Sequence, residues 1–409
     1  MSENTPQLSI PPEAVWGPTF DVGRATDAYI ATIPAADRER SDAYYEGGYW
    51  IELWGTLLTV ALCALLLHLR FAARLRDFAA ARGRGPWLQS LVVALGFMTA
   101  LAVLMLPWVL YTGYFREHQY GMSNQAMGGF LGEWLVGSLL AVAFVGLAVS
   151  VTYSLLRRVR ERWVPWATGL TFLFVLFLMT VSPVFVAPLF NEYRPLPPGE
   201  MRDSILALAK SSEVPADDVY WFNASKQTKR ISANVSGLGG TVRIALNDNL
   251  MNGTSLPEIR AVMGHEMGHY RLKHGLKLGI GFTLALGIGY FVVNHAFGRV
   301  QRRHGERWGI RDLADPAGLP LAFAMFVVVM YLLTPVTNSM VRTAENQADA
   351  YGLDAAREPH GFASVAMRLS TYRKLEPGAL EEVLFYDHPS GRARVERSMQ
   401  WLADHPPKQ

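Results

Sequence analysis

The chain has little cysteine and little charge, and each shortage excludes a class of protein. Cys63 is the one cysteine among 409 residues, so the chain cannot form an internal disulfide or a cysteine-based metal site. Charged residues make up 18% and the formal net charge is +3. With no basic stretch that interleaves aromatic residues, we expect no nucleic acid as a partner. Because half of the residues are hydrophobic, the balance indicates a polytopic membrane protein with a sizeable soluble part.

The first 50 residues also lack an apolar core near their start. Their charged side chains are mostly acidic, from Glu3 to Glu46, against Arg24, Arg38 and Arg40. A cleavable signal peptide begins with basic residues followed by an apolar core. We therefore expect residues 1–50 to form an N-terminal extramembrane segment.

Six apolar runs contain no Lys, Arg, Asp or Glu and are long enough to span a bilayer, which takes about 20 helical residues. They predict an all-α polytopic membrane fold with about six transmembrane helices. Pro107, Pro183 and Pro335 lie within runs, where we expect them to kink the helices. The runs are Leu53–Leu69, Trp87–Tyr111, Trp134–Leu156, Trp166–Phe190, Leu278–Phe297 and Leu319–Val341.

Arginines gather in the loops after the first, third and fifth runs. Residues 70–84, 157–162 and 299–311 together hold 14 arginines. Alternate loops lie on one side of a membrane, and the positive-inside rule makes that side cytoplasmic. This count predicts that the acidic N-terminus, the soluble segment after the fourth run and the C-terminus lie on the other side.

The segment between the fourth and fifth runs, residues 191–277, predicts a small α/β insertion. Residues 201–212 have the pattern of an amphipathic helix, and residues 218–223 and 241–247 that of strands. Residues 231–236 are expected to form an edge strand, to which an extended peptide can add by backbone hydrogen bonds. A closed hairpin without a ligand fits the same spacing.

The insertion ends in a predicted helix that contains His265–His269, with the sequence HEMGH. The helix is expected to begin after Ser255, with Glu258 completing a capping box. Residues four apart share one face of a helix, so the two histidines can hold one metal ion. In the zinc peptidase pattern H-E-x-x-H, Glu266 is the general base toward a zinc-activated water. The alternative is that two histidines share a polar face by chance.

A third metal ligand is available on the helical stretch that follows the sixth run. A catalytic zinc site needs three protein ligands and an open position, and Glu345 is the candidate third ligand. Asp349 lies one turn further on the same face, where it can accept the free N–H of a ligating histidine. A solvated helix face is the alternative interpretation of this acidic pair.

These features predict five parts of the chain. They are residues 1–50, the N-terminal extramembrane segment; 51–190, a four-span membrane region; 191–277, the soluble insertion with the HExxH helix; 278–341, two further spans; and 342–409, a C-terminal helical segment with the third zinc ligand.

With these motifs, the chain resembles the M48 metallopeptidases and, more closely, the type 1 or Ste24-type CAAX prenyl proteases. The resemblance covers most of the chain from about residue 25. Besides HEMGH and Glu345-x-x-x-Asp349, it rests on Phe115–Gly121 (FREHQYG), Ala187–Asn191 (APLFN), Ser225-Lys226, Arg243-Ile244, Gln347–Asp349 and His388-Pro389.

The resemblance implies roles for individual residues. His265, His269 and Glu345 match the family's zinc ligands, and Glu266 matches its general base. His388 and Arg394 match a histidine and an arginine that stabilise the oxyanion and organise the pocket.

The resemblance also implies a substrate-binding position and a membrane architecture. Where the family has an asparagine on its substrate-binding edge strand, this chain has Ser232, with Asn234 two residues on and on the same side of a strand. The family's helices enclose a chamber with the zinc site facing the cytosol. The arginine loops favour the opposite face, so the side of the zinc site stays open.

The sequence therefore predicts a multi-pass integral membrane zinc endopeptidase with Zn²⁺ as cofactor, expected in a bacterial cell membrane. Its expected partners are the lipid bilayer and a peptide or protein substrate, which is prenylated in the family. A general quality-control protease is one alternative, and a non-proteolytic zinc-binding scaffold, which does not need Glu266, is another. A transporter is less consistent, since no run carries paired intramembrane charges.

Overall fold

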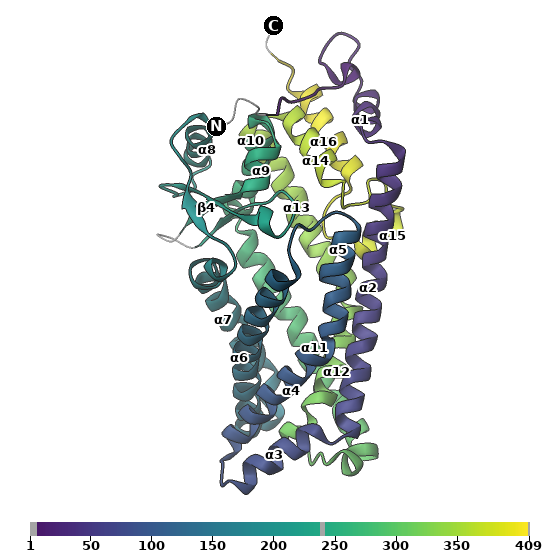
Figure 1. The fold of residues 1–409 in the computed structure, drawn as a ribbon, viewed down its shortest axis with the longest axis vertical. Helices are drawn as coiled ribbons and strands as arrows, with labels where there is room; N and C mark the ends of the chain where they lie inside the picture. The colour runs from purple at the N-terminus through teal and green to yellow at the C-terminus, as the bar shows by residue number, and fades with distance from the viewer. Residues whose placement is uncertain (1–5, 238–241, 408–409) are drawn as a thin grey trace.

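The computed structural model describes residues 6–237 and 242–407 and has two tiers (Figure 1). Long helices form the lower tier, which we call the membrane tier. The upper tier contains the sheet and most of the shorter helices, and both ends of the chain lie on its side of the molecule.

The helices of the membrane tier match the six predicted apolar runs. Within the described residues, four helical stretches are long and apolar enough to cross a membrane, and a pair bent by 50° can form one more span. One of the four, residues 127–189, contains two helices that Arg160 separates with a positive φ of 42°. The helices are α2 (Ala35–His68), α4 (Pro86–Val109), α6 (Met127–Val159), α7 (Trp163–Val181), α11 (His274–Trp308) and the bent pair α12 (Leu319–Leu332) and α13 (Thr334–Ala356).

Helices α6 and α7 form an antiparallel pair, because the start of α6 and the segment after α7 both contact the region of the sheet. Near the start of α6, Glu133 Oε1 accepts a hydrogen bond from Gln227 Nε2 at 2.6 Å. Beyond the end of α7, the carbonyl of Pro183 accepts one from Arg243 Nη2 at 2.7 Å. The two helices are therefore separate spans, as the sequence predicts.

The prolines mark departures from regular helix. Pro107 lies close to the end of α4, which continues as the π-helical turn Leu110–Phe115. Pro183 lies in a second π-helical turn, Ser182–Val186, and Pro335 lies in the first turn of α13, after the bend. Proline lacks the backbone N–H that a regular helix needs, so the helix must change its hydrogen bonding at these positions.

The insertion forms a four-stranded sheet in the order β1-β2-β4-β3. Strand β2 pairs with β4 in parallel, and the two outer pairs are antiparallel. Strand β3 is therefore an edge, as predicted, although it begins at residue 233 rather than 231. The strands are β1 (Tyr193–Pro195), β2 (Val219–Phe222), β3 (Ala233–Ser236) and β4 (Arg243–Asn247); Thr241 of the predicted strand lies outside the described residues.

The sheet packs on two helices around one hydrophobic core. Helix α8 (Glu200–Ser211) covers the predicted amphipathic segment and buries Ile205. Helix α10 (Leu256–Arg271) carries the HEMGH motif and buries Ile259 and Met263 in the same core. This packing holds the motif helix beside the edge strand.

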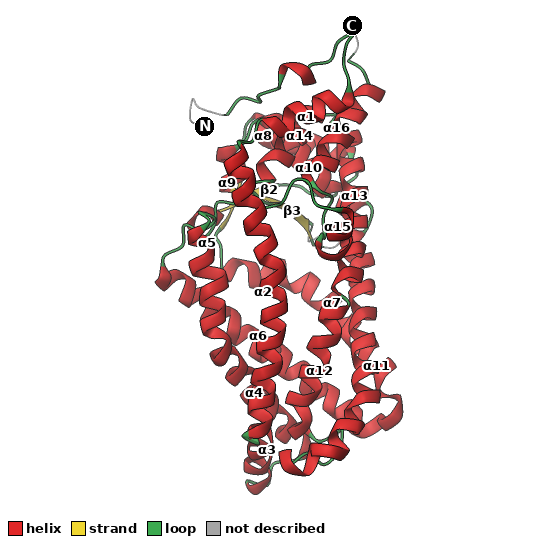
Figure 2. Cartoon of the chain, turned by 90° about the vertical axis from the view of Figure 1, so that its right-hand side faces the viewer, coloured by secondary structure: helices red, strands yellow, loops and turns green. Residues whose placement is uncertain are grey.

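The N-terminal segment packs against the C-terminal helices. Tyr29 on α1 shares a hydrophobic core with Val395 and Met399 on α16. The remaining elements are α1 (Val22–Ala31), α3 (Phe71–Ala81), α5 (Arg116–Gln119), α9 (Asp248–Gly253), α14 (Pro359–Leu369), α15 (Ala379–Phe385), α16 (Gly391–Asp404) and the short turns η1 (Pro12–Ala14), η3 (Arg160–Arg162), η5 (Ala187–Leu189), η6 (Ala224–Lys226) and η8 (Pro316–Gly318). Figure 2 shows α1, α14 and α16 together at the end of the molecule away from α3.

Candidate metal centre

Helix α10 begins with the predicted capping box. The backbone N and Oγ of Ser255 each donate to Glu258 Oε2 at 2.7 Å. The other oxygen, Oε1, accepts from Arg368 Nε at 2.5 Å and from Ser364 Oγ at 2.7 Å. Burial alone would raise the pKa of Glu258, but these hydrogen bonds hold it below its ordinary value. The start of the motif helix is thereby fixed to α14.

Glycines allow α10 and α13 to approach closely. A Cβ atom at Gly264 would lie 2.9 Å from the carbonyl oxygen of Gly352, and one at Gly268 would lie 3.1 Å from the Cα of Ala348. Side chains at these positions would push the helices apart. The close contact is what brings the histidines of α10 opposite Glu345 of α13.

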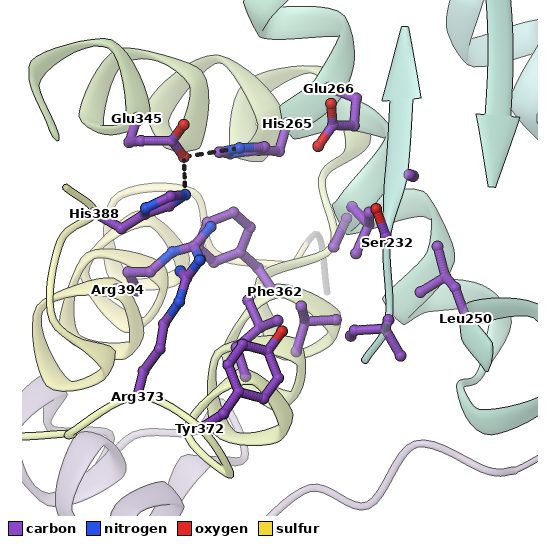
Figure 3. A pocket seen from close by; sticks show the side chains of 16 residues that line it. Ser232, Leu250, His265, Glu266, Glu345, Phe362, Tyr372, Arg373, His388 and Arg394 are labelled. Carbon is purple, nitrogen blue, oxygen red and sulfur yellow. Dashed lines mark ion pairs between the residues drawn. The ribbon is translucent and has the colours of Figure 1, made fainter. Parts of the chain in front are cut away.

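His265, His269 and Glu345, from the two helices, converge on one point, which we call the metal point. His265 Nε2 lies 3.2 Å from Glu345 Oε2 and 3.1 Å from His269 Nε2, which lies 3.3 Å from Glu345 Oε1. All the candidate ligand atoms are within 4.8 Å of one another. Figure 3 shows His265 and Glu345 facing each other at the pocket wall.

The donor set fits a single divalent metal ion. Nitrogen and carboxylate donors bind such ions at about 2.0–2.2 Å, and donors a little over 3 Å apart can share one ion at that range. Glu345 Oε2 is buried between Nε2 of His265 and Nε2 of His388, at 3.2 and 3.3 Å. A buried carboxylate that faces two imidazole nitrogens which can both act as ligands is a donor set that suits a cation.

Charged groups behind the ligands hold His265 in place. Asp349 is fully buried, and its Oδ1 lies 2.8 Å from His265 Nδ1. Arg394 binds the same carboxylate with two donors, at 2.6 and 3.0 Å, and Arg397 adds a third at 3.3 Å. The carboxylate therefore stands between the histidine and two arginines, and fixes the ring nitrogen that faces away from the metal point.

His269 is supported in a different way. Its Nδ1 lies 3.0 Å from Nδ1 of His274, and His274 Nε2 lies 3.0 Å from Gln347 Oε1. An amide oxygen only accepts, so His274 Nε2 carries its proton and Nδ1 is left to accept the Nδ1–H of His269. This series of hydrogen bonds leaves the Nε2 lone pair of His269 directed at the metal point.

Glu266 lines the same pocket as His265 and Glu345, and Figure 3 shows it on the side of His265 away from Glu345. Burial raises its pKa above the ordinary range, and the neighbouring His265 and His269 act in the opposite direction. A carboxylate whose pKa is raised returns an accepted proton more readily than one with an ordinary pKa.

Two neighbouring cavities lie on this side of the metal centre. The smaller, of about 230 Å³, is lined by His265, Glu266 and Glu345, and the larger has about 710 Å³. Four residues line both cavities and therefore stand at the boundary between them. They are Ile231, Ser232, Tyr372 and Arg373.

The structure brings together most of the predicted site residues. Ser232, His388 and Arg394 line the smaller cavity together with the three residues named above. His388 Nε2 lies 3.3 Å from Glu345 Oε2, and its Nδ1 lies 2.8 Å from Asp387 Oδ1. Within the part of the chain that the structure describes, Asn234 is not among the lining residues of either cavity.

Two residues next to the site, His274 and Arg373, are not among those predicted from the sequence. His274 follows HEMGH by five residues, and a third histidine so close to the motif was a usable signal. Arg373 lies in the loop between α14 and α15, and no local pattern pointed to it.

Comparisons with known proteins agree with this arrangement. The model of peptidase family M48 matches residues 195–406, and a model described as the CAAX prenyl protease N-terminal domain with five membrane helices matches residues 24–192. The uncharacterized metalloprotease YhfN of Bacillus subtilis (strain 168) is 32% identical over 310 residues, 75% of this chain and 72% of that protein. A CAAX prenyl protease 1 homolog of Oryza sativa subsp. japonica is 24% identical over 372 residues, 88% of this chain and 86% of that protein.

A solved structure has the same fold. The crystal structure of S. mikatae Ste24p superposes with a TM-score of 0.74 at 21% identity, covering 90% of this chain and 89% of that one. Because the M48 model matches more than half of the chain and the membrane helices precede and follow its sheet, this protein belongs to peptidase family M48 and is a multi-pass membrane metalloprotease of the Ste24 type.

Proposed function

We propose that the protein is a zinc endopeptidase in which His265, His269 and Glu345 hold the zinc ion. Two histidines and one glutamate are the ligand set of a well-known class of catalytic zinc sites, which keep one position open. The observation that carries the proposal is that these donors converge at the wall of a cavity that also contains Glu266.

In the proposed mechanism, Glu266 is the general base. When bound, zinc supplies a Lewis acid at this wall of the cavity. Glu266 takes a proton from the attacking water and later gives it to the leaving amine. The effect of burial on its pKa supports this double role, because a carboxyl group with an ordinary pKa returns a proton poorly.

We assign His388 to support of the oxyanion. Its Nδ1 lies 2.8 Å from Asp387 Oδ1, and its Nε2 lies 3.3 Å from Glu345 Oε2. An N–H donor at Nε2 can stabilise negative charge that develops on the carbonyl oxygen. Arg394 has two donors engaged by Asp349, which supports a role in positioning His265; direct support of the oxyanion by Arg394 remains a prediction.

We further propose that a peptide substrate adds to the edge of β3. Ser232 and Ala233 line the smaller cavity at the start of this strand, which has a neighbour on one side only within the described sheet. An extended peptide can complete the free edge with backbone hydrogen bonds and lie across the metal point. A contact from Asn234 remains a prediction.

As the substrate class we propose proteins with a prenylated CAAX terminus. The support is the match of residues 24–192 to the CAAX prenyl protease N-terminal model and the names of the relatives. A broader endopeptidase that cleaves unprenylated membrane proteins is the second candidate. It is favoured by the polar lining of the larger cavity, which includes Glu52, Arg230 and Asn338.

Cleavage of matched farnesylated and unprenylated CAAX peptides by the purified protein separates the two candidates. We expect faster cleavage of the farnesylated peptide, with Glu213→Gln as a control because this exposed glutamate pairs with Arg271 outside both cavities. Equal cleavage of both peptides would favour the broader endopeptidase. A zinc-loaded wild type that cleaves neither would contradict the proposed function.

A further inference from the structure

Arg373 stands at the boundary between the two cavities. It lies in the loop that joins α14 to α15, and it is one of the four residues that line both cavities. Figure 3 shows its side chain extending from the loop toward Arg394 and His388, into the pocket that contains the metal ligands. A peptide that occupies both cavities would therefore contact the boundary that Arg373 helps to form.

The guanidinium of Arg373 differs from those of the other arginines in these cavities because it lacks a partner. Arg394 is paired with Asp349, and Arg230 is paired with Glu117. Among the described residues, no ion pair or hydrogen bond engages the Arg373 side chain, and its Nη1 is buried without an acceptor. A buried guanidinium nitrogen without an acceptor is unfavourable, so this group is poised for an acceptor from outside the chain.

Two acidic residues, Glu52 and Asp387, line the larger cavity together with Arg373. Asp387 Oδ1 lies 2.8 Å from His388 Nδ1, and among the described residues neither acid forms an ion pair or hydrogen bond with Arg373. The ring of Tyr372 lies 5.9 Å from Arg373 Cζ and gives the guanidinium an aromatic neighbour. The guanidinium therefore keeps donors that a substrate carboxylate can engage.

We propose that Arg373 binds a carboxylate of the peptide substrate. The inference rests on the proposed peptidase function. A guanidinium matches a carboxylate with two parallel hydrogen bonds and is the preferred protein group for such recognition. The carboxylate comes either from the C-terminus of the substrate or from an acidic side chain near the cleaved bond.

The position of Arg373 gives this contact a consequence for specificity. Ile231 and Ser232, which precede β3, also line both cavities, so a peptide aligned on the edge strand lies alongside Arg373. Fixing one carboxylate there sets the distance along the peptide between that carboxylate and the bond at the metal point. With a C-terminal carboxylate, the enzyme would cleave at a set number of residues from the chain end.

Binding to an inactive enzyme tests the proposal without requiring turnover. Three fluorescent peptides are compared on Glu266→Gln protein. The first has a free C-terminal acid, the second is the same peptide as its C-terminal amide, and the third is the amide with its last residue replaced by glutamate. We expect the acid to bind roughly tenfold or more tightly than the amide, as for a charge-assisted hydrogen bond. Adding Arg373→Gln should reduce this ratio to about one, and Arg373→Lys should restore part of it.

The pattern of results distinguishes the sources and the failures. If the glutamate peptide binds as tightly as the free acid, Arg373 accepts side-chain carboxylates as well; if it binds like the amide, Arg373 recognises the C-terminus. Arg271→Gln is the control, since this arginine pairs with Glu213 outside the cavities. An acid-to-amide ratio that is one in the parent protein, or unchanged by Arg373→Gln, would overturn the proposal. Failure of the peptidase function is seen separately, as absence of cleavage by the zinc-loaded wild type.

Discussion

The two tiers of the molecule bury different kinds of polar groups. In the upper tier, Glu258 and Asp349 are fully buried charges, each engaged by arginine. Within the long helices of the membrane tier, buried polar groups include hydroxyls such as Ser150 and Thr283, each donating to the carbonyl four residues earlier in its own helix; the buried ion pair Arg76–Asp315 lies outside these helices, at the end opposite the sheet. A hydroxyl satisfied within its own helix places no demand on its neighbours, whereas a buried charge must have its partner in the correct place.

This difference predicts how each tier responds to mutation. The metal centre depends on long-range charge pairs, so single substitutions there should change metal binding and activity together. The membrane tier depends on apolar packing, so substitutions there should change stability while the metal centre keeps its composition. The five predictions that follow test this contrast, beginning with the largest expected effect.

Replacing a proposed metal ligand should have the largest effect. His269→Ala removes one of the three converging donors, and we expect loss of both bound zinc and peptide hydrolysis. Zinc content by mass spectrometry and cleavage of a labelled peptide measure the two losses. The exposed His295, which bonds to the carbonyl of Phe291, offers His295→Ala as a control. Full activity of His269→Ala would exclude the proposed ligand set.

Asp349→Asn should lower the metal affinity through His265, the ligand that Asp349 contacts. The change leaves Arg394 buried without its anionic partner, and breaking a buried pair in this way costs about 3–5 kcal/mol of unfolding free energy. Loss of the partner of a metal-binding histidine typically costs about 10–100-fold in metal affinity. Chelator competition and thermal unfolding measure these effects. An unchanged metal affinity together with an unchanged melting temperature would contradict the predicted difference between the two tiers.

Phe97→Ala is the corresponding test in the membrane tier. Phe97 is completely buried and packs edge-on against Phe323, so its truncation should cost about 3–5 kcal/mol. We expect zinc content and the KM for peptide to stay close to those of the wild type at temperatures where the variant is folded. Thermal unfolding in detergent measures the first effect and metal analysis the second. Leu139→Ala, at a side chain 61% exposed, is the control with little expected change.

His274→Ala should lower zinc affinity less severely than loss of a ligand. The substitution removes the acceptor for His269 Nδ1, and we expect a decrease of roughly tenfold with the ion still bound at high zinc. Competition with a chelator of known affinity measures this decrease. His274→Gln offers a side-chain oxygen as acceptor and should recover part of the affinity. If both variants bind zinc as the wild type does, the hydrogen bonds from His269 through His274 to Gln347 have no role in the site.

The smallest expected effect is the pH dependence that Glu258 contributes. Its pKa is lower in the folded protein than in the unfolded chain, where glutamate has a pKa of about 4.3. The stabilisation is therefore fully present above about pH 4.3 and is lost as the pH falls through the folded pKa. We expect the difference in melting temperature between wild type and Glu258→Gln to shrink below about pH 4. A difference that grows with acidification would show the opposite shift.

Much of the fold and the core of the site followed from local patterns. The six runs, the HEMGH helix and the edge strand depend on periodicity and composition within a few residues, which the sequence displays directly. Glu345 and Asp349 were recognisable because their spacing repeats one helical turn. The packing of α1 on α16 was not predictable, since it depends on contacts between residues more than 300 positions apart.

The roles of individual arginines were also beyond the sequence. Arg394 was identified by resemblance, but its engagement with Asp349 depends on how α13 and α16 pack. Arg373 can be recognised only in the folded protein, where it lines two cavities and its side chain has no hydrogen-bond partner among the described residues. Such properties arise only when the chain is folded, because they depend on where distant carboxylates lie.

The side of the membrane that the metal centre faces is still a prediction. The arginine-rich loops lie at the end opposite the sheet, where Arg76 contacts Asp315, and the positive-inside rule places that end in the cytoplasm. The resemblance to the CAAX prenyl proteases implies the reverse. Labelling of a C-terminal tag in whole cells and in inside-out vesicles distinguishes the two orientations.

We propose that this membrane protein hydrolyses peptides with zinc and Glu266 together. Zinc content and peptide cleavage are measured on the same purified samples of wild type and Glu266→Gln. We expect about one zinc ion per chain in both proteins and a loss of about 10²–10⁴-fold in turnover for the variant. Turnover retained by Glu266→Gln, or full activity in wild type without zinc, would contradict it.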